Sequence, residues 1–299
     1  MSDMPQARVK NPLSRRNKTF FAILIPVLVL FFLFNTWPLL NGVFYSFTNY
    51  QGYGTYEMVG GRNYADLFQD SRVGQSYLFT FKYALCGTVL VNVVSLLLAL
   101  GLNGKIKFKS ALRGIYFVPN ILAGLVLGYI FSFIFTYILP AIGEAWNIDW
   151  IRNSWLASPD MAWVAVLIVG VWQAAAMNTI IYISGLQTVP AEVYEASILD
   201  GTSRWREFWH VTFPLIFPFV SINLVLSTKN FLMVFDQIMS LTQGGPAQST
   251  ESISYLIYQN GINGGQFGFQ SANAVIFFLV IVAFSVFQLR NMNSKEEQL

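Results

Sequence analysis

Long apolar runs alternate with short polar connections along the whole chain. Six runs are long enough to cross about 30 Å of hydrocarbon as helices that rise 1.5 Å per residue. They extend over approximately Phe20 to Leu40, Tyr77 to Leu102, Gly114 to Tyr137, Met161 to Ser184, Phe213 to Phe235 and Ala272 to Leu289. The first run is too long for the core of a signal peptide, and no small-residue cleavage site follows it. The pattern predicts an all-α, polytopic membrane protein with six transmembrane helices.

Composition strengthens this interpretation. Of the 299 residues, 55% are hydrophobic and only 11% are charged. A soluble domain of this length needs a charged surface that so few charges cannot cover. The single cysteine, Cys86, lies inside an apolar run and excludes a disulfide framework. We expect one membrane domain over residues 20–290, with short tails at residues 1–19 and 291–299.

The distribution of lysine and arginine predicts the orientation of the chain. Most of the 18 basic residues lie in the two tails and in the connections after the second and fourth runs. The connection from Asp236 to Gln270, on the other side, has none. Basic connections stay on the cytoplasmic side of a membrane. Both termini and the segment from Val189 to Pro214 are therefore expected to be cytoplasmic.

Motifs for catalysis are absent from the sequence. There is no GxxxxGK[ST] loop for nucleotide phosphates, no HExxH or CxxC, and no GxSG. The only histidine, His210, stands beside Trp209 at the edge of a run, where an interfacial or packing role is expected. We expect no ATPase site, no metal site and no enzymatic activity in this chain, and a net charge of only +3 gives no reason to expect a nucleic-acid partner.

The densest polar segment is VPAEVYEASILDGTSRWREFWHVTFP, Val189 to Pro214. Pro190 suits the first turn of a helix, where its missing N–H has no intrahelical use. Gly201 can adopt positive φ to end that helix, and Thr202 or Ser203 can cap the next one. The segment therefore predicts two short helices joined by a hinge, with Pro214 at the start of the next membrane run.

This segment resembles a known motif. Glu195 to Ser197, then Gly201 after three residues, then Val211 to Pro214 after nine more, is similar to the EAA loop of permease subunits in binding-protein-dependent ABC importers, EAA-x3-G-x9-I-x-L-P. The departures are a serine for the second alanine and other apolar residues for isoleucine and leucine. A second stretch, Leu241 to Val275, with its GGP at Gly244 and its FGFQSANA before the last run, resembles the outward loop of carbohydrate permeases of the maltose and glycerol-phosphate type.

The resemblance implies a MetI-like ABC importer permease fold, a place in a bacterial or archaeal plasma membrane, and a set of partners. These are a second permease subunit, usually an unlike chain, two cytoplasmic ATPase subunits that bind ATP and magnesium, and an extracellular or periplasmic solute-binding protein. It implies no cofactor in this chain. The positions that it assigns to coupling with the ATPase are Glu195, Ala196, Ser197, Asp200, Gly201 and Pro214. Glu195 would meet basic groups of the ATPase, Ala196 and Ser197 would allow close approach, and Gly201 would set the angle between the two helices.

Sugar recognition needs hydrogen-bonding groups and aromatic walls within the spans. The fifth run places Ser227, Asn230 and Phe231 at positions that face sugar in the maltose permease, by the resemblance. The further candidates in the third and fourth runs are Asn120, Gly124, Trp172 and Gln173. Bridging between helices or simple packing is the alternative role for each of them. Structural roles are expected for Asn178, Lys229 and Asp236.

Two functions remain open at this point. The first is a permease subunit of an ATP-driven carbohydrate importer. The second is a secondary sugar transporter driven by an ion gradient, in which Lys229 and Asp236 would be coupling charges and which would transport without an ATPase.

Overall fold

A computed structural model describes residues 12–104 and 108–296. The long helices are α1 (Pro12–Phe31), α4 (Ser71–Asn103), α8 (Pro159–Thr188), α12 (Phe217–Leu232) and α15 (Phe267–Glu296). The shorter ones are α2 (Trp37–Tyr45), α3 (Arg62–Leu67), α5 (Lys109–Ile121), α6 (Gly124–Phe133), α7 (Leu139–Ala145), α9 (Ala191–Leu199), α10 (Arg204–Glu207), α11 (Phe213–Leu215), α13 (Asp236–Leu241) and α14 (Ile253–Tyr258). Within the described ranges no residue lies in a β-strand, so the predicted all-α class is confirmed.

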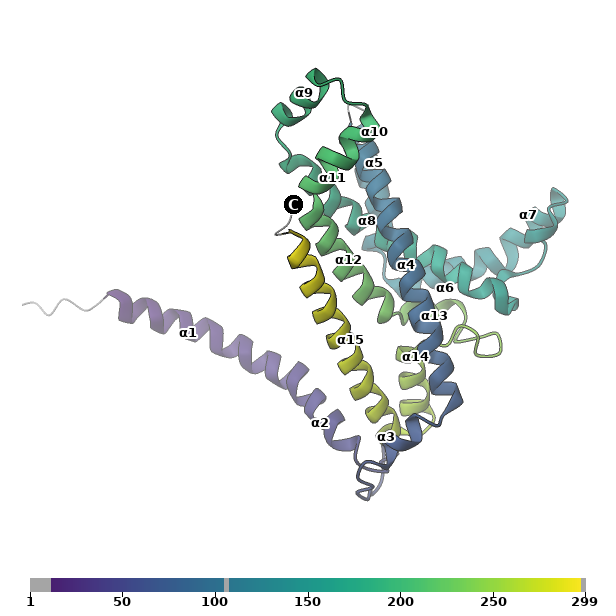
Figure 1. Cartoon of the computed structure of the whole chain (residues 1–299). Coiled ribbons are helices and arrows are strands. Elements are labelled where there is room, and N and C mark those ends of the chain that lie inside the picture. The colour runs from purple at the N-terminus through teal and green to yellow at the C-terminus, as the bar shows by residue number, and fades with distance from the viewer. Residues whose placement is uncertain (1–11, 105–107, 297–299) are drawn as a thin grey trace, which may run out of the picture.

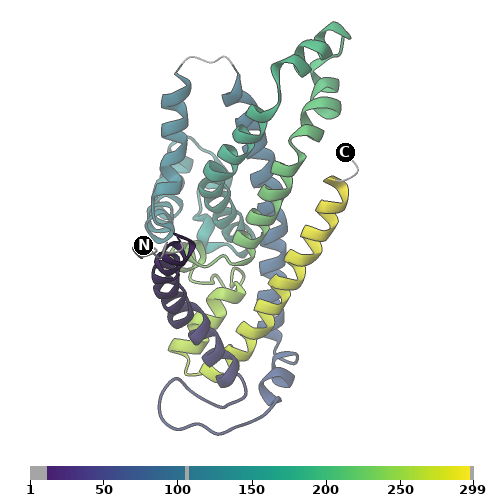
Figure 2. The same ribbon diagram turned by 90° about the vertical axis from the view of Figure 1, so that its left-hand side faces the viewer.

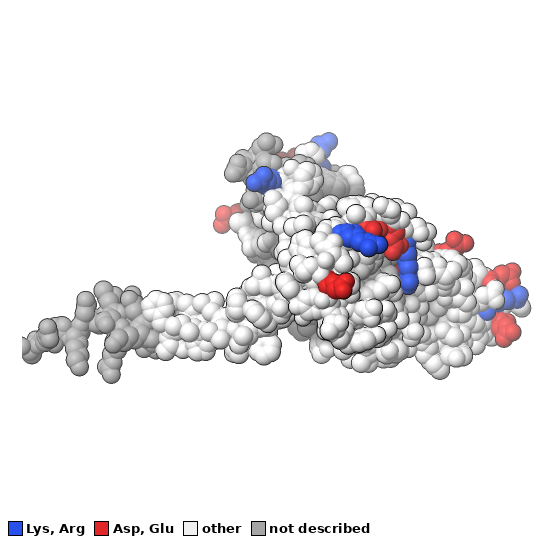
Figure 3. All heavy atoms as spheres, turned by 90° about the horizontal axis from the view of Figure 1, so that it is seen from below, with Lys and Arg blue, Asp and Glu red and all other residues white. Residues whose placement is uncertain are grey.

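Helices α4, α8, α12 and α15 form the central bundle (Figures 1 and 2). Helices α1 and α2 are continuous through the π-helical turn Phe32–Thr36 and together give the apolar segment Phe20–Tyr45. Its α1 part projects away from the bundle, and the most apolar 18 residues of the segment are all unburied. From Phe20 to Tyr45 the segment contains no Lys, Arg, Asp or Glu, and its surface is white in the view from the α3 end (Figure 3). Helices α6 and α7 extend away on a different side. The bundle thus carries an apolar arm that contacts it through α2, which packs against α15, while the part from Phe20 to Phe31 is almost entirely exposed.

The two ends of the bundle differ as the basic residues predict. Helix α9, the end of α4, the beginning of α5 and the end of α15 lie at one end (Figure 2). Helix α3 and the beginning of α15 lie at the opposite end. Among the described residues, five helices are long and apolar enough to span a membrane, and a sixth span results if the bent pair Arg204–Leu215 and Phe217–Leu232 is counted as one.

Two of the predicted spans are broken in the structure. The third is not one helix, because Leu122 and Ala123 are extended and separate α5 from α6. Pro119 lacks an N–H for the last turn of α5, which weakens the helix just before the break. The fifth bends by 72° at Ile216, where Pro218 opens a new helix. It also ends at Leu232, before the predicted boundary.

Close packing of α6 against α13 depends on glycine. A Cβ atom at Gly124 would lie 2.6 Å from Oδ2 of Asp236, and one at Gly128 would collide with the side chain of Ser240. The four-residue spacing places both glycines on one face of α6, as in other close helix pairs in membranes. Helix α13 can therefore lie directly on the backbone of α6, and this contact holds the end of α12 next to the break at Leu122.

Candidate functional site

A cavity of about 200 Å³ lies between α4, α5, α8, α12 and α13. Its lining consists of Tyr83, Asn120, Gly170, Gln173, Ala174, Asn230, Phe231, Val234 and Gln237. Four of these, Asn120, Gln173, Asn230 and Phe231, are sugar-contact candidates from the sequence, and the structure brings them together from three helices. The cavity is open to the surface of the chain on one side, where Asn230 is exposed.

Side-chain amides supply the polar part of the cavity. Gln237 donates from Nε2 to Oε1 of Gln173 over 2.8 Å. Gln173 donates in turn to the carbonyl oxygen of Leu122 over 3.3 Å, a group that the break between α5 and α6 leaves without a helical partner. Each amide presents both donors and an acceptor. Such a set matches a polyhydroxylated ligand, whose hydroxyl groups also donate and accept.

Two aromatic rings form the apolar wall. The ring centroids of Tyr83 and Phe231 lie 5.6 Å apart, and both side chains are almost fully buried. Glycines make room for them: a Cβ at Gly87 would collide with the Phe231 ring, and one at Gly170 would collide with the Tyr83 hydroxyl. Tyr83 also donates to the Val166 carbonyl over 3.4 Å. Because both rings are so deeply buried, they shape the wall of the cavity and leave little ring surface free for a ligand.

The other three sugar-contact candidates lie outside this lining. Gly124 faces Asp236, and Trp172 packs edge-on against Phe131 with centroids 5.3 Å apart. Ser227 is 1% exposed and accepts from Nδ2 of Asn92 over 2.9 Å. Gly124 and Ser227 are thus helix-packing residues, whereas Trp172 contacts Phe131 and remains 39% exposed.

A buried polar chain explains the position of Ser227. Tyr182 donates to Oδ1 of Asn92 over 2.6 Å, and the Nδ2 of Asn223 donates to the Asn178 carbonyl over 3.1 Å. Ser227 itself donates to the Asn223 carbonyl over 2.6 Å. These contacts join α4, α8 and α12. Asn178 contributes its backbone carbonyl to them, and the structural role expected of its side chain stays a prediction.

Sequence reasoning missed Tyr83 and Gln237. Gln237 lies two residues beyond the predicted end of the fifth run, and Tyr83 stands in a run that reads as apolar. The four-residue spacing of Tyr83 and Gly87 could have indicated Tyr83, because it places a large and a small residue next to each other on one face of α4.

The segment from Val189 to Pro214 has the predicted form of two short helices and a hinge. Gly201 has φ of +67°, and the N–H of Thr202 bonds the Ser197 carbonyl over 3.2 Å, which ends α9 in a left-handed turn. The Ser203 hydroxyl caps α10 by accepting from the Arg206 N–H over 3.4 Å. Helix α9 stands at the tip of the molecule, away from the bundle (Figure 1).

The predicted coupling residues do not all point outward. Glu195, Ala196 and Asp200 are exposed, whereas Ser197 is 6% exposed and donates to Oε2 of Glu207 over 3.5 Å. Ser197 therefore joins α9 to α10 instead of facing outward for close approach. Pro214 lies in the one-turn helix α11, three residues before α12 begins. The outward apolar residues next to Glu195 are Ile198 and Leu199, which are 67% and 88% exposed.

A match to a known protein family identifies the fold and the general class of this protein. Residues 91–295 match the model of the binding-protein-dependent transport system inner membrane component. The chain belongs to this family. It is therefore a multi-pass inner-membrane permease component of an ABC transporter, and the EAA-like segment lies within the matched residues.

Similar permeases carry names that refer to sugars. The chain is 37% identical to the multiple sugar-binding transport system permease protein MsmF of Streptococcus mutans, over 91% of this chain and 93% of that protein. It is 32% identical to the probable starch degradation products transport system permease protein AmyD of Thermoanaerobacterium thermosulfurigenes, over 94% and 93%. The fold of the permease is also that of a bacterial ABC transporter involved in the import of alginate, with a TM-score of 0.81, 19% identity and coverage of 94% and 96%.

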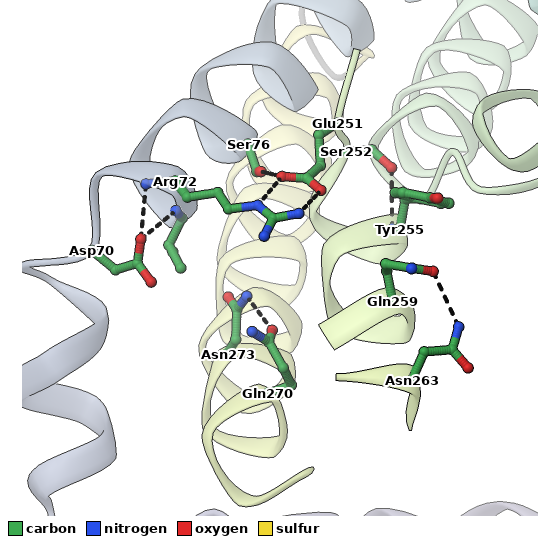
Figure 4. A network of polar contacts seen from close by, with 11 residues as sticks. Asp70, Arg72, Ser76, Glu251, Ser252, Tyr255, Gln259, Asn263, Gln270 and Asn273 are labelled. Carbon is green, nitrogen blue, oxygen red and sulfur yellow. Dashed lines mark hydrogen bonds and ion pairs between the residues drawn. The ribbon is translucent and has the colours of Figure 1, made fainter. Parts of the chain in front are cut away.

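The permease has a second polar cluster at the opposite end from α9. Arg72, at the start of α4, donates from Nε and Nη2 to the two carboxylate oxygens of Glu251 over 2.8 and 2.7 Å (Figure 4). The Ser76 hydroxyl donates to the same carboxylate over 3.4 Å. Glu251 is 3% exposed. This bidentate pair fixes the end of the loop between α13 and α14 to α4, because planar guanidinium and carboxylate groups match in geometry.

Proposed function

We propose that this permease forms half of the translocation pathway of an ATP-driven carbohydrate importer. One observation carries the proposal: α12 connects the two features that such a subunit needs. At one end it follows the exposed hairpin of α9 and α10 through α11, and at the other it supplies Asn230 and Phe231 to the amide-lined cavity. A movement of the hairpin therefore reaches the cavity through one helix. The names of the similar permeases support sugar as the cargo.

The resemblance of the coupling segment and of the outward loop supports the following set of partners. An ATPase subunit binds the exposed hairpin, with Glu195 toward its basic groups and Ile198 and Leu199 in an apolar cleft. Two ATPase subunits hold ATP and magnesium, so this chain needs no cofactor of its own. A second, unlike permease subunit completes the pathway, and a solute-binding protein delivers the sugar on the α3 side.

Uptake by the reconstituted complex tests the proposal against an ion-coupled transporter. The permease is reconstituted in vesicles with the products of neighbouring genes, and uptake of labelled trehalose and malto-oligosaccharides is measured with and without ATP inside. ATP-dependent uptake that ionophores leave unchanged is expected. Uptake that needs an ion gradient and no ATPase would instead support the alternative and remove the role of α9.

Replacing Gln173 by leucine is expected to slow sugar uptake about tenfold at saturating solute-binding protein. The change removes the hydrogen bonds that Gln173 offers to the ligand and leaves the amide of Gln237 without its partner, and each lost bond costs about 1 kcal/mol. The control is Gln187→Leu, the same change on α8 in an exposed position outside the cavity. Equal uptake by the two variants would show that the amides do not contact sugar.

A further inference from the structure

The fold by itself leaves the electric charge of the cargo open. The alginate importer that shares this fold is involved in the import of an acidic polysaccharide. The cavity of this permease is different in character from a site for an acidic ligand. None of the described residues that line it is a lysine, arginine or histidine, and none is an aspartate or glutamate. Its polar side chains are four amides and the hydroxyl of Tyr83.

The charged residues next to the cavity do not supply a cation either. Asp236 directly precedes Gln237, and its Oδ2 atom would lie 2.6 Å from a Cβ atom at Gly124. Within residues 12–104 and 108–296, no lysine or arginine forms an ion pair with Asp236. Lys229 precedes Asn230 on α12, but successive helical residues point about 100° apart, and Lys229 is not part of the lining. The carboxylate of Asp236 therefore opposes the entry of an anion.

The hydrogen-bonding groups of the cavity include acceptors as well as donors. Gln237 uses one N–H on Gln173, and Gln173 uses one on the Leu122 carbonyl. Each of these amides keeps a second N–H, and Gln237 also keeps its Oε1 atom for a ligand. The side-chain amides of Asn120 and Asn230 make no hydrogen bond to other described residues. A hydroxyl group can donate and accept in such a site, whereas a carboxylate only accepts and would leave the amide oxygens unpaired.

We propose that this cavity binds one neutral sugar ring of the cargo and discriminates against rings that carry a carboxylate or a phosphate. An anion that enters the cavity from water loses its hydration and gains no cation from the lining, which is costly for an unpaired charge. The volume of about 200 Å³ is smaller than the about 300–1,000 Å³ of sites for drug-sized ligands, so it suits a single ring. The inference rests on the proposed function, because it names the class of sugar that the same cavity takes.

Charged thiol reagents measure the electrostatic preference of the cavity without a transported sugar. Asn230→Cys is introduced into the complete complex. Its reaction rates with a trimethylammonium and a sulfonate derivative of ethyl methanethiosulfonate are each divided by the rate with 2-mercaptoethanol. The cationic reagent is expected to be favoured at least about tenfold, because the anion meets an unpaired carboxylate in a site of low dielectric constant. Equal normalised rates, or a preference for the anionic reagent, would overturn the proposal.

Two lysine variants show whether the preference arises in the cavity itself. Gln237→Lys, combined with Asn230→Cys, adds a cation to the lining and is expected to raise the normalised rate of the anionic reagent about tenfold. The matched control is Gln187→Lys, which adds the same charge on α8 outside the lining and should leave the ratio unchanged. Equal effects of the two lysines would contradict a preference set by the cavity. The complex without the introduced cysteine gives the background from Cys86 and from the other subunits.

A matched pair of sugars tests the cargo directly. Methyl α-glucoside and methyl α-glucuronide differ only in the carboxylate that replaces a hydroxymethyl group. The glucoside is expected to protect Asn230→Cys from uncharged methyl methanethiosulfonate at concentrations at least about tenfold lower than the glucuronide. Equal protection by both sugars would overturn the neutral-ring proposal while leaving the proposed function intact. Protection by no sugar, trehalose and malto-oligosaccharides included, would contradict the proposed function and this inference with it.

Discussion

The variant Arg72→Met is expected to lose about 3 kcal/mol of unfolding free energy, the largest effect on stability that we expect from a single charged residue of the permease. Glu251 is 3% exposed and would keep a buried negative charge whose remaining polar contact is the Ser76 hydroxyl. This expected loss of stability is at the low end of the range for breaking a buried ion pair, because the Arg72 side chain is 36% exposed. The measurement is the midpoint of thermal unfolding in nanodiscs, followed by tryptophan fluorescence.

A surface ion pair of the same type gives the control. Arg62 and Asp66 are 3.6 Å apart, with side chains 77% and 51% exposed, and such pairs contribute little. Arg62→Met should therefore leave the midpoint nearly unchanged. The double variant of Arg72→Met with Glu251→Leu should recover part of the loss, because it removes the buried charge as well. Equal midpoints for Arg62→Met and Arg72→Met would show that the Glu251 pair does not hold the loop.

The variant Gly201→Val is expected to reduce ATP-dependent uptake at least about tenfold. Gly201 has φ of +67°, which costs a residue with a Cβ atom about 1–2 kcal/mol, and a β-branched side chain is among the least suited to it. No atom lies within 4 Å of a Cβ placed there, so the strain acts through the backbone and not through a collision. The angle between α9 and α10 must then change, which moves the proposed ATPase contact. Uptake and ATP hydrolysis are measured in proteoliposomes.

Asparagine separates the effect of backbone conformation from the loss of glycine. Gly201→Asn adds a side chain of comparable size, but asparagine adopts the left-handed region readily. This variant should retain most of the uptake. If valine and asparagine impair uptake equally, the left-handed hinge is not what the coupling segment requires.

How far the sequence predicts the fold depends on where apolar runs are interrupted. The second, fourth and sixth predicted runs lie within α4, α8 and α15, since uninterrupted apolar residues leave the backbone no alternative to a helix in lipid. The breaks at Leu122 and Ile216 were not predicted. They occur inside apolar stretches, and the first also depends on α13 packing against Gly124 and Gly128, a contact between distant parts of the chain.

The residues of the cavity were likewise predicted only in part from the sequence. Polar side chains at membrane depth identified Asn120, Gln173 and Asn230 correctly as residues of one cavity, because a membrane helix rarely carries an amide without a partner. The same rule also selected Ser227, whose partner is Asn92 on another helix. Composition alone cannot separate an amide that faces a ligand from a hydroxyl that joins two helices. The roles of these residues in sugar contact remain predictions.

The break between α5 and α6 limits what a mutational scan of this permease can detect. The last carbonyl groups of α5 and the first N–H groups of α6 have no partners within their own helices. They lie next to the cavity, and the Leu122 carbonyl already accepts from Gln173. Peptide groups survive every side-chain substitution. Alanine scanning will therefore undercount the polar groups around the cavity, whereas an ester in place of the peptide bond after Leu122 would weaken one of them directly.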